Sequence, residues 1–170
     1  VEKIRRERKH AEQGKPARII IKINALVAQQ MIQVLSAASM AGGELRLMVR
    51  GMWCLRPGIA GVSDNIEVRA IVGRFLEHTR VLYFENDGNP EFYCSSADWM
   101  ERNLFRRVET LFPIEDSKLR ERIMSELELY LADNTQAWIL QSDGSYVRQS
   151  PGDNPPLSAQ QNLLAEIAGT

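Results

Sequence analysis

His78 is one of only two histidines in the chain, and it lies two residues before Arg80. Both belong to the stretch GRFLEHTRVLYFEN, residues 73–86, in which a strand-like run follows the histidine. An imidazole can donate or accept a proton near neutral pH, and a guanidinium can bind phosphate through two parallel hydrogen bonds. The pair is typical of a phosphate site, and a half-buried histidine that caps the strand is the alternative interpretation.

Arginines are concentrated around this pair. Six arginines but only three acids lie between Arg46 and Arg80, although the net charge of the chain is -1. A nucleic-acid-binding domain usually carries a wider basic surface and a higher pI than the value near 6.2 found here. The pattern therefore predicts a compact phosphate site and no nucleic-acid partner.

Two apolar runs predict the elements that position this site. Residues 17–26 (ARIIIKINAL) and 44–50 (ELRLMVR) read as strands, and the helical spacing of residues 28–43 predicts a helix between them. A strand, helix and strand in this order form a right-handed crossover with a parallel pair. Ligands bind outside the carboxyl ends of such strands. This rule places four polar side chains on one edge: Lys22, Asn24, Arg50 and Arg56.

The roles of several of these residues stay open at this stage. Arg56 is expected either to contact phosphate or to pair with Asp64, and Arg80 either to contact phosphate or to pair with Glu109. Lys22 is equally consistent with a phosphate contact and with a structural role. Three small or acidic residues of SSADW either line the site or form a turn: Ser95, Ser96 and Asp98. Two histidines and scattered acids predict no permanent metal site.

The remaining sequence predicts an α/β fold with a mixed sheet flanked by helices. Turn-forming residues between 80–86 and 91–96 indicate a hairpin, residues 106–114 a further strand, and residues 137–148 a small hairpin. Residues 115–134 predict an amphipathic helix with one apolar face, and residues 158–169 a last helix. That face is expected to hold Leu119, Ile123, Leu127 and Tyr130. Residues 1–16 are expected to form an exposed connector helix, and residues 17–170 the domain.

Cysteine usage and hydropathy bear on the cellular setting. Cys54 and Cys94 have no CxxC spacing and no signal peptide ahead of them, so we expect buried, reduced thiols and a cytoplasmic protein. The apolar runs are far shorter than the roughly 20 residues of a membrane span, so no transmembrane segment is expected.

The order of residues after His78 resembles the half-site of the phospholipase D superfamily. There, a histidine and a basic residue two positions on are followed by a small-residue turn and a glutamate, here Glu109. Arg80 replaces the usual lysine and Asp98 the usual asparagine. These departures count against a phosphodiesterase.

Longer motifs make a second resemblance more specific. VRGMWCLRPGIAG, FLEH and SSADWMERN are similar to the C-terminal region of bacterial polyphosphate kinases, and the resemblance runs from Val1 to Ala168. It implies a phospholipase D-like fold. It also implies an enzyme that moves the terminal phosphate of ATP onto a histidine and from there onto polyphosphate, reversibly with ADP. His78 matches the family's second active-site histidine, and Arg50 matches an arginine that binds nucleotide phosphate.

The resemblance also implies what lies outside this chain. The phosphorylated histidine is expected in a related domain upstream of Val1, so the fragment alone is expected to be inactive. Mg²⁺ is expected to arrive with the nucleotide and to be held mostly by the absent part. We further expect a homo-oligomer, in the cytoplasm or peripheral to the inner membrane. The alternatives are a phospholipase D-like phosphodiesterase half-site and a non-catalytic module that binds nucleotide or polyphosphate.

Overall fold

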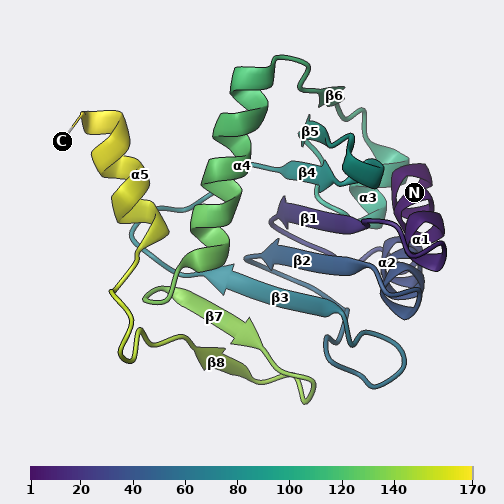
Figure 1. Cartoon of the computed structure of the whole chain (residues 1–170), viewed down its shortest axis with the longest axis horizontal. Helices are drawn as coiled ribbons and strands as arrows, with labels where there is room; N and C mark the ends of the chain where they lie inside the picture. Colours follow the sequence, from purple (N-terminus) through teal and green to yellow (C-terminus); the bar gives the residue numbers. More distant parts are fainter. Residues whose placement is uncertain (170) are drawn as a thin grey trace.

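The computed structural model describes residues 1–169, in which one mixed sheet of eight strands forms the centre of the molecule (Figure 1). β1, β2 and β3 run parallel, and the other neighbouring strands pair antiparallel. In sheet order the strands are β6 (Leu111–Pro113), β5 (Glu91–Ser95), β4 (Val81–Phe84), β1 (Arg18–Ile23), β2 (Glu44–Val49), β3 (Ile66–Ile71), β7 (Ala137–Leu140) and β8 (Tyr146–Arg148).

β1 occupies the middle of the sheet because its side chains are apolar on both faces. Ile20 packs in the cluster on one face, and Ile19 and Ile21 pack in the cluster on the other. The parallel register joins Ile23 to Val49, so β1 and β2 end side by side. The predicted crossover is confirmed, and it delivers the residues that follow both strands to the same edge.

Helices cover both faces of the sheet. On one face, α2 (Gln29–Met40) buries Met31, Leu35 and Ala38, and α1 (Glu2–Glu12) buries Ile4 in the same cluster. On the other face, α4 (Ser117–Ala132) packs Leu127 against the sheet. The short α3 (Glu101–Arg106) precedes β6, and α5 (Ala159–Ala168) lies beside α4 at the edge where β1–β3 end (Figure 1). The α/β fold with a flanked mixed sheet is confirmed.

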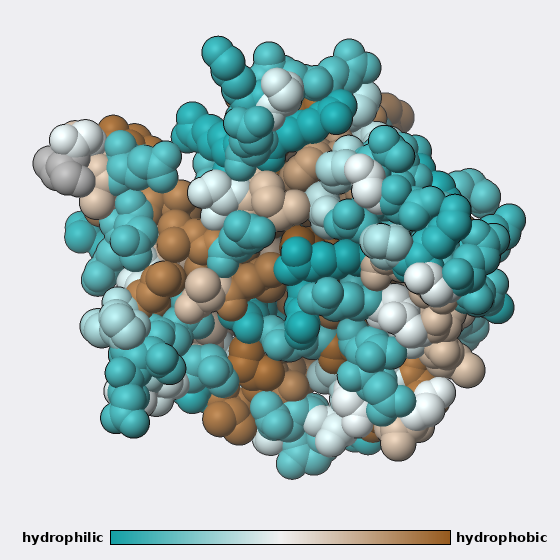
Figure 2. Space-filling view, in the orientation of Figure 1, coloured by the Kyte–Doolittle hydropathy of each residue, from teal (hydrophilic) through white to brown (hydrophobic). Residues whose placement is uncertain are grey.

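Two sequence predictions of local structure need correction. The strand expected over residues 106–114 is only β6, because Arg106 still belongs to α3 and only Leu111–Pro113 pairs with β5. Leu119 does not belong to the buried face of α4, since it lies in the first turn of the helix and is 51% exposed. Figure 2 shows further apolar surface beside α5, whose Ile167 is 74% exposed.

Helix α1 is not the exposed connector that its many charges suggested. Ile4 and Glu7 are each 1% exposed. Glu7 accepts hydrogen bonds from the backbone N–H of Asn86 at 3.1 and 3.2 Å and pairs with Arg6 at 3.3 Å. A buried carboxylate is tolerated only with such partners, and burial still raises the pKa of Glu7. The helix is thus fixed to the β4–β5 turn by polar contacts that its hydrophobic pattern does not reveal.

The thiols also differ from expectation. Cys54 is exposed and Cys94 is half-buried, so the prediction of buried cysteines is wrong for Cys54. Both are free thiols, and partial burial raises the pKa of Cys94. Among the helices of residues 1–169, none is long and apolar enough to cross a lipid bilayer.

The anchor of α1 on β5 predicts a pH dependence of stability. Burial would raise the pKa of Glu91, but hydrogen bonds from Arg6 and Lys3 outweigh it and lower this pKa to about 2. The folded pKa therefore lies below the ordinary value of 4.5, so the stabilisation is complete above about pH 4.5 and is lost as the pH falls toward 2. We expect Glu91→Gln to unfold at lower urea concentration than wild type at pH 7.

The difference in the urea concentration at the unfolding midpoint between Glu91→Gln and wild type should shrink steadily as the pH is lowered from about 5 to about 2.5. Glu12→Gln is the matched control, because Glu12 forms only an exposed pair with Arg8. Exposed helix pairs contribute about 0.3–0.5 kcal/mol. If the difference between the two unfolding midpoints stays constant with pH, the proposed role of the Glu91 carboxylate is wrong.

Candidate functional site

Three of the polar residues predicted for the strand ends do lie together. Lys22, Asn24 and Arg50 line one small cavity at the carboxyl ends of β1 and β2, and Glu77 from the loop after β3 lines it too. Because β1 and β2 pair in parallel with Ile23 opposite Val49, the next residues, Asn24 and Arg50, lie beside each other. Arg50 donates from Nη2 to Oδ1 of Asn24 at 3.3 Å.

Arg50 keeps most of its hydrogen-bonding capacity free. Its Nε atom is buried and has no partner among residues 1–169, and no carboxylate of the described chain lies within ion-pair distance. A guanidinium has five N–H donors, and a buried donor without a partner costs free energy. Arg50 is therefore suited to an anion that fills the missing contacts.

Lys22, by contrast, is already paired. Its Nζ lies 2.8 Å from Oε2 of Glu77, and the two side chains are 10% and 14% exposed. The same ammonium lies 5.0 Å from the centre of the Tyr130 ring, on α4. Burial, followed by the nearby charge of Glu77, raises the pKa of the Tyr130 hydroxyl, which stays protonated. Lys22 thus holds Glu77 at the cavity wall.

His78 lies in the irregular loop between β3 and β4. Its side chain is exposed and forms no hydrogen bond or ion pair with residues 1–169. Its backbone carbonyl, in contrast, accepts a hydrogen bond from Nη1 of Arg80 at 3.1 Å. The reading of His78 as a half-buried cap is therefore wrong, and its imidazole is available to a ligand.

Arg80 and Asp98 form a forked ion pair at the edge of the site. Nε and Nη2 of Arg80 each lie 3.0 Å from a carboxylate oxygen of Asp98. Asp98 also accepts hydrogen bonds from the backbone N–H groups of Asn24, at 2.8 Å, and Ala25. Burial would raise the pKa of Asp98, but these partners lower it. Asp98, and not Glu109, is the ion-pair partner of Arg80.

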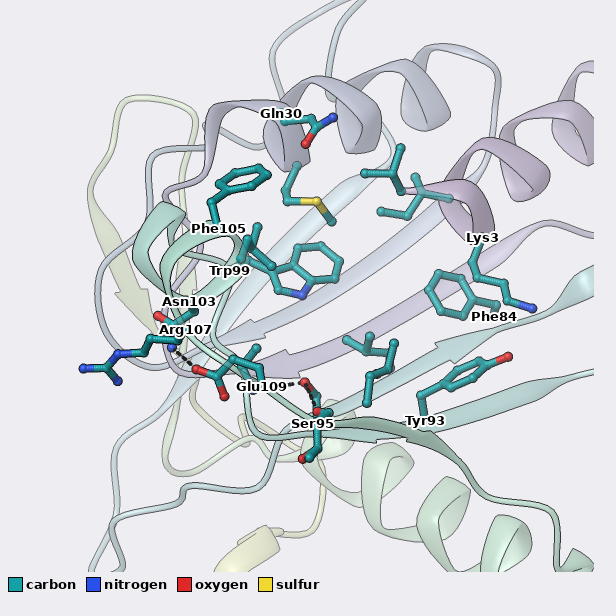
Figure 3. Close-up of a pocket in the computed structure, with 18 residues that line it drawn as sticks. Lys3, Gln30, Phe84, Tyr93, Ser95, Trp99, Asn103, Phe105, Arg107 and Glu109 are labelled. Carbon is teal, nitrogen blue, oxygen red and sulfur yellow. Dashed lines mark hydrogen bonds between the residues drawn. The ribbon is translucent and has the colours of Figure 1, made fainter.

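The other small residues face a different part of the molecule. Ser95 and Glu109 line a second cavity of about 450 Å³, between the β4–β5 face of the sheet and the helices, with Trp99 in its wall (Figure 3). Glu109 accepts hydrogen bonds from Asn103, at 2.7 Å, and from Ser96. The hydroxyl of Ser96 also accepts from the backbone N–H of the residue after Glu109, at 3.0 Å. Ser95 and Ser96 therefore form the turn, as their alternative reading expected.

Arg56 does not join the cavity of Arg50. It lies in the loop between β2 and β3, is exposed, and forms no ion pair with Asp64, whose carboxylate instead accepts from the backbone N–H of Gly61 at 2.6 Å. The carbonyl of Arg56 accepts from the hydroxyl of Ser63 at 2.6 Å. The ion-pair alternative for Arg56 is thus wrong, and a phosphate contact stays a prediction.

Two residues at this edge were missed from the sequence. Glu77 was counted among the acids of residues 46–80 and lies within FLEH, but no role was predicted for it, although its position next to His78 was a usable signal. Gln160, on α5, donates from Nε2 to the Glu77 carboxylate at 2.8 Å and is 5% exposed. Nothing in the sequence points to Gln160, because it lies more than 80 residues from the loop that it contacts.

The described residues offer no cluster of three or more histidine, cysteine or acidic side chains that could hold a metal ion. Two acids at this edge already have partners: Glu77, next to His78 in the chain, pairs with Lys22, and Asp98 pairs with Arg80. Residues 1–169 therefore do not fit a resident metal, and Mg²⁺ would need ligands from outside them.

Solved structures with little sequence similarity identify the class of fold. A phospholipase D family member from Salmonella typhimurium superposes with a TM-score of 0.56 at 14% identity, over 80% of this chain and 89% of that one. Identity this low is evidence of the fold alone. The chain has a phospholipase D-like fold.

The chain belongs to the polyphosphate kinase family. The family model "Polyphosphate kinase C-terminal domain 2" matches residues 1–160. A polyphosphate kinase of Pseudomonas aeruginosa is 56% identical over 169 residues, which are 99% of this chain and 24% of that protein. The crystal structure of polyphosphate kinase from Porphyromonas gingivalis superposes with a TM-score of 0.95 at 38% identity, over 99% of this chain and 26% of that one. This chain therefore spans about a quarter of the length of these relatives.

The Arg80–Asp98 pair predicts a strong energetic coupling. We expect Asp98→Ala to lower the free energy of unfolding more than Arg80→Ala, because Asp98 also binds two backbone N–H groups. In a double-mutant cycle followed by urea unfolding, the coupling between them should fall within the range of about 0.5–3 kcal/mol typical of contacting residues. Strictly additive effects would refute this pairing. Arg102→Ala is the control, because Arg102 is exposed and forms no ion pair within residues 1–169.

Proposed function

We propose that this chain is a catalytic-half domain of a polyphosphate kinase, which helps to transfer the terminal phosphate of ATP to inorganic polyphosphate, reversibly with ADP. The phosphohistidine would lie in a domain outside this chain, so the chain alone would be inactive. The observation that carries the proposal is the combination of Arg50, with an unpartnered buried Nε, and an unpartnered imidazole at His78, in a member of this family.

In this proposal Arg50 binds a phosphate of the nucleotide. Its free donors lie where β1 and β2 end, at the edge where open α/β sheets bind ligands. Phosphoryl transfer needs positioning and positive charge more than covalent chemistry from the protein. A fixed guanidinium supplies both, because it neutralises the phosphate and holds it in one orientation.

His78 acts on the phosphoryl group during its transfer. Its exposed imidazole would donate a hydrogen bond or a proton to a phosphoryl oxygen, and the oxygen would return the proton when the transfer is complete. The imidazole is not the residue that carries the phosphate in this proposal. Mg²⁺ would accompany the nucleotide, with ligands outside residues 1–169.

A phosphodiesterase half-site is the less favoured function. Its basic residue would have to present an uncompensated charge to a phosphodiester, and the charge of Arg80 is already compensated by Asp98, while its Nη1 donates to the carbonyl of His78. Homo-oligomerisation, the cytoplasmic location and the division into residues 1–16 and 17–170 stay predictions.

The function is tested by replacing His78 in the complete enzyme of which we propose this chain to be a part. His78→Ala should lower the rate of polyphosphate synthesis from labelled ATP by about 100-fold or more, because a positioned proton donor is lost. Its unfolding midpoint should equal that of wild type, since the imidazole is exposed and forms no hydrogen bond or ion pair within residues 1–169. His10→Ala, on α1, is the matched control and should keep the wild-type rate. If His78→Ala also keeps that rate, the proposed function is wrong.

Arg50→Ala should weaken ADP binding by about 1.5–3 kcal/mol, the free energy of a hydrogen bond to a charged group. Isothermal titration measures the change in Kd. Arg50→Lys should restore only part of the affinity, because an ammonium cannot make the forked contact. Arg122→Ala is the control, since Arg122 pairs only with Glu126 on the outer face of α4. An Arg50→Ala enzyme with wild-type affinity would remove Arg50 from the site.

A further inference from the structure

The loop that carries His78 has no regular structure, yet it is held at defined points. Residues 72–80 lie between β3 and β4 without helix or strand, and most of them are exposed. The loop leaves the end of β3 and passes beside α5 before it returns to β4 (Figure 1). Such a loop would be mobile without anchors, because exposed irregular segments with few buried contacts open easily.

Gln160, in the first turn of α5, is the principal anchor. Its Oε1 accepts from the backbone N–H of Phe75 at 3.0 Å, and its Nε2 donates to the carbonyl of Phe75 at 2.9 Å. The side-chain amide thus pairs with both backbone groups of one residue, as a neighbouring strand would. Three residues further along the chain is His78.

Glu77 provides the second point of attachment, directly before His78. One carboxylate oxygen accepts from Nε2 of Gln160 at 2.8 Å, and the other lies 2.8 Å from Nζ of Lys22. Both oxygens of Glu77 are therefore fixed, one from α5 and one from β1. This leaves little freedom for the backbone at His78, although the imidazole itself forms no hydrogen bond or ion pair within residues 1–169.

Gly73 allows Gln160 to approach the loop this closely. A Cβ atom at position 73 would lie 2.3 Å from Oε1 of Gln160 and 2.6 Å from Oε1 of Gln136. The same Gln136 oxygen accepts a hydrogen bond from the hydroxyl of Ser158, at 3.2 Å. Any larger residue would push the Gln160 amide away from Phe75.

The start of α5 is itself fixed to the body of the protein. Asp133, 2% exposed at the end of α4, accepts from the backbone N–H of Ala159 at 2.8 Å. Its other oxygen accepts from the N–H groups that lead into β7, including Gln136 at 2.7 Å. Gln160 therefore extends from a rigid support, which an anchor requires.

We propose that Gln160 is a positioning residue for His78: it holds the loop of residues 72–80 so that the imidazole meets the transferring phosphoryl group. This inference rests on the proposed function of His78. A misplacement of about 1 Å at a reacting group can cost 100-fold in rate. Gln160 forms no hydrogen bond with Arg50, and Lys22 still holds Glu77 at the cavity wall, so the loss should appear in kcat and not in the KM for ATP.

A double-mutant cycle in the complete enzyme separates positioning from a loss of folded protein. The rates of polyphosphate synthesis are compared for wild type, Gln160→Ala, His78→Ala and the double variant. We expect Gln160→Ala alone to lower kcat about 10- to 100-fold. In the His78→Ala background the same change should have almost no effect, because Gln160 acts only through His78.

Each outcome of the cycle decides the inference. Equal fold-losses in both backgrounds would show that Gln160 acts through folding, and would overturn the inference while leaving the proposed function intact. A wild-type kcat for Gln160→Ala would also overturn the inference about Gln160 and would leave the proposed function intact. A wild-type rate for His78→Ala would instead overturn the proposed function, and this inference with it.

Hydrogen exchange and two further variants complete the test. Exchange in peptides covering residues 72–80 should rise in Gln160→Ala, because the Phe75 N–H loses its acceptor; unchanged exchange would refute the anchor. Gly73→Ala should reproduce the loss of kcat while the sequence of α5 stays unchanged, and so serves if Gln160→Ala folds poorly. Gln161→Ala is the matched control, since this exposed neighbour makes only a backbone contact and should retain the wild-type kcat and exchange.

Discussion

The carboxylate of Asp98 receives hydrogen bonds from segments that are far apart in the sequence. It binds the N–H groups of Asn24 and Ala25, where β1 ends, and the guanidinium of Arg80, where β4 is about to begin. Asp98 itself follows β5. This half-buried charge therefore fixes the ends of β1 and β5 relative to the start of β4, because a carboxylate largely removed from water needs these partners. The place where the His78 loop returns to the sheet depends on it.

Whether a charge has a partner inside the fold also distinguishes Arg50 from other arginines nearby in the sequence. Arg46, Arg69 and Arg80 each lie within ion-pair distance of an acid, so their charges are compensated inside the fold. Arg50 faces Asn24, which accepts one hydrogen bond without cancelling the charge. The structure thus divides the arginines of residues 46–80 into compensated ion pairs and others without an acidic partner among residues 1–169, and of the latter Arg50 lies in a cavity at the strand ends. Counting charges cannot make this division, since it depends on which strands are adjacent.

Sequence reasoning succeeded where local pattern determines the outcome. The apolar run of β1, the helical period of α2 and the shared edge of Asn24 and Arg50 follow from side-chain periodicity and one topological rule. It failed where a polar residue meets a distant partner. Glu109, and not Asp98, was considered as the ion-pair partner of Arg80, α1 was expected to be exposed despite Glu7, and Gln160 was not considered. Such pairs carry no periodic signal, because each depends on a single contact between elements remote in the chain.

The loop of His78 combines exposure with restraint, and the two properties have separate causes. The exposed imidazole has no hydrogen-bonding partner within residues 1–169 because the neighbouring side chains already have theirs: Glu77 bonds Lys22 and Gln160, and Arg80 bonds Asp98. The backbone is restrained by those same interactions. A histidine with its own intramolecular hydrogen bond would have to break it to reach a phosphoryl oxygen, which would add to the barrier. Restraint applied through the neighbours avoids this cost, because the imidazole approaches its ligand with both ring nitrogens free.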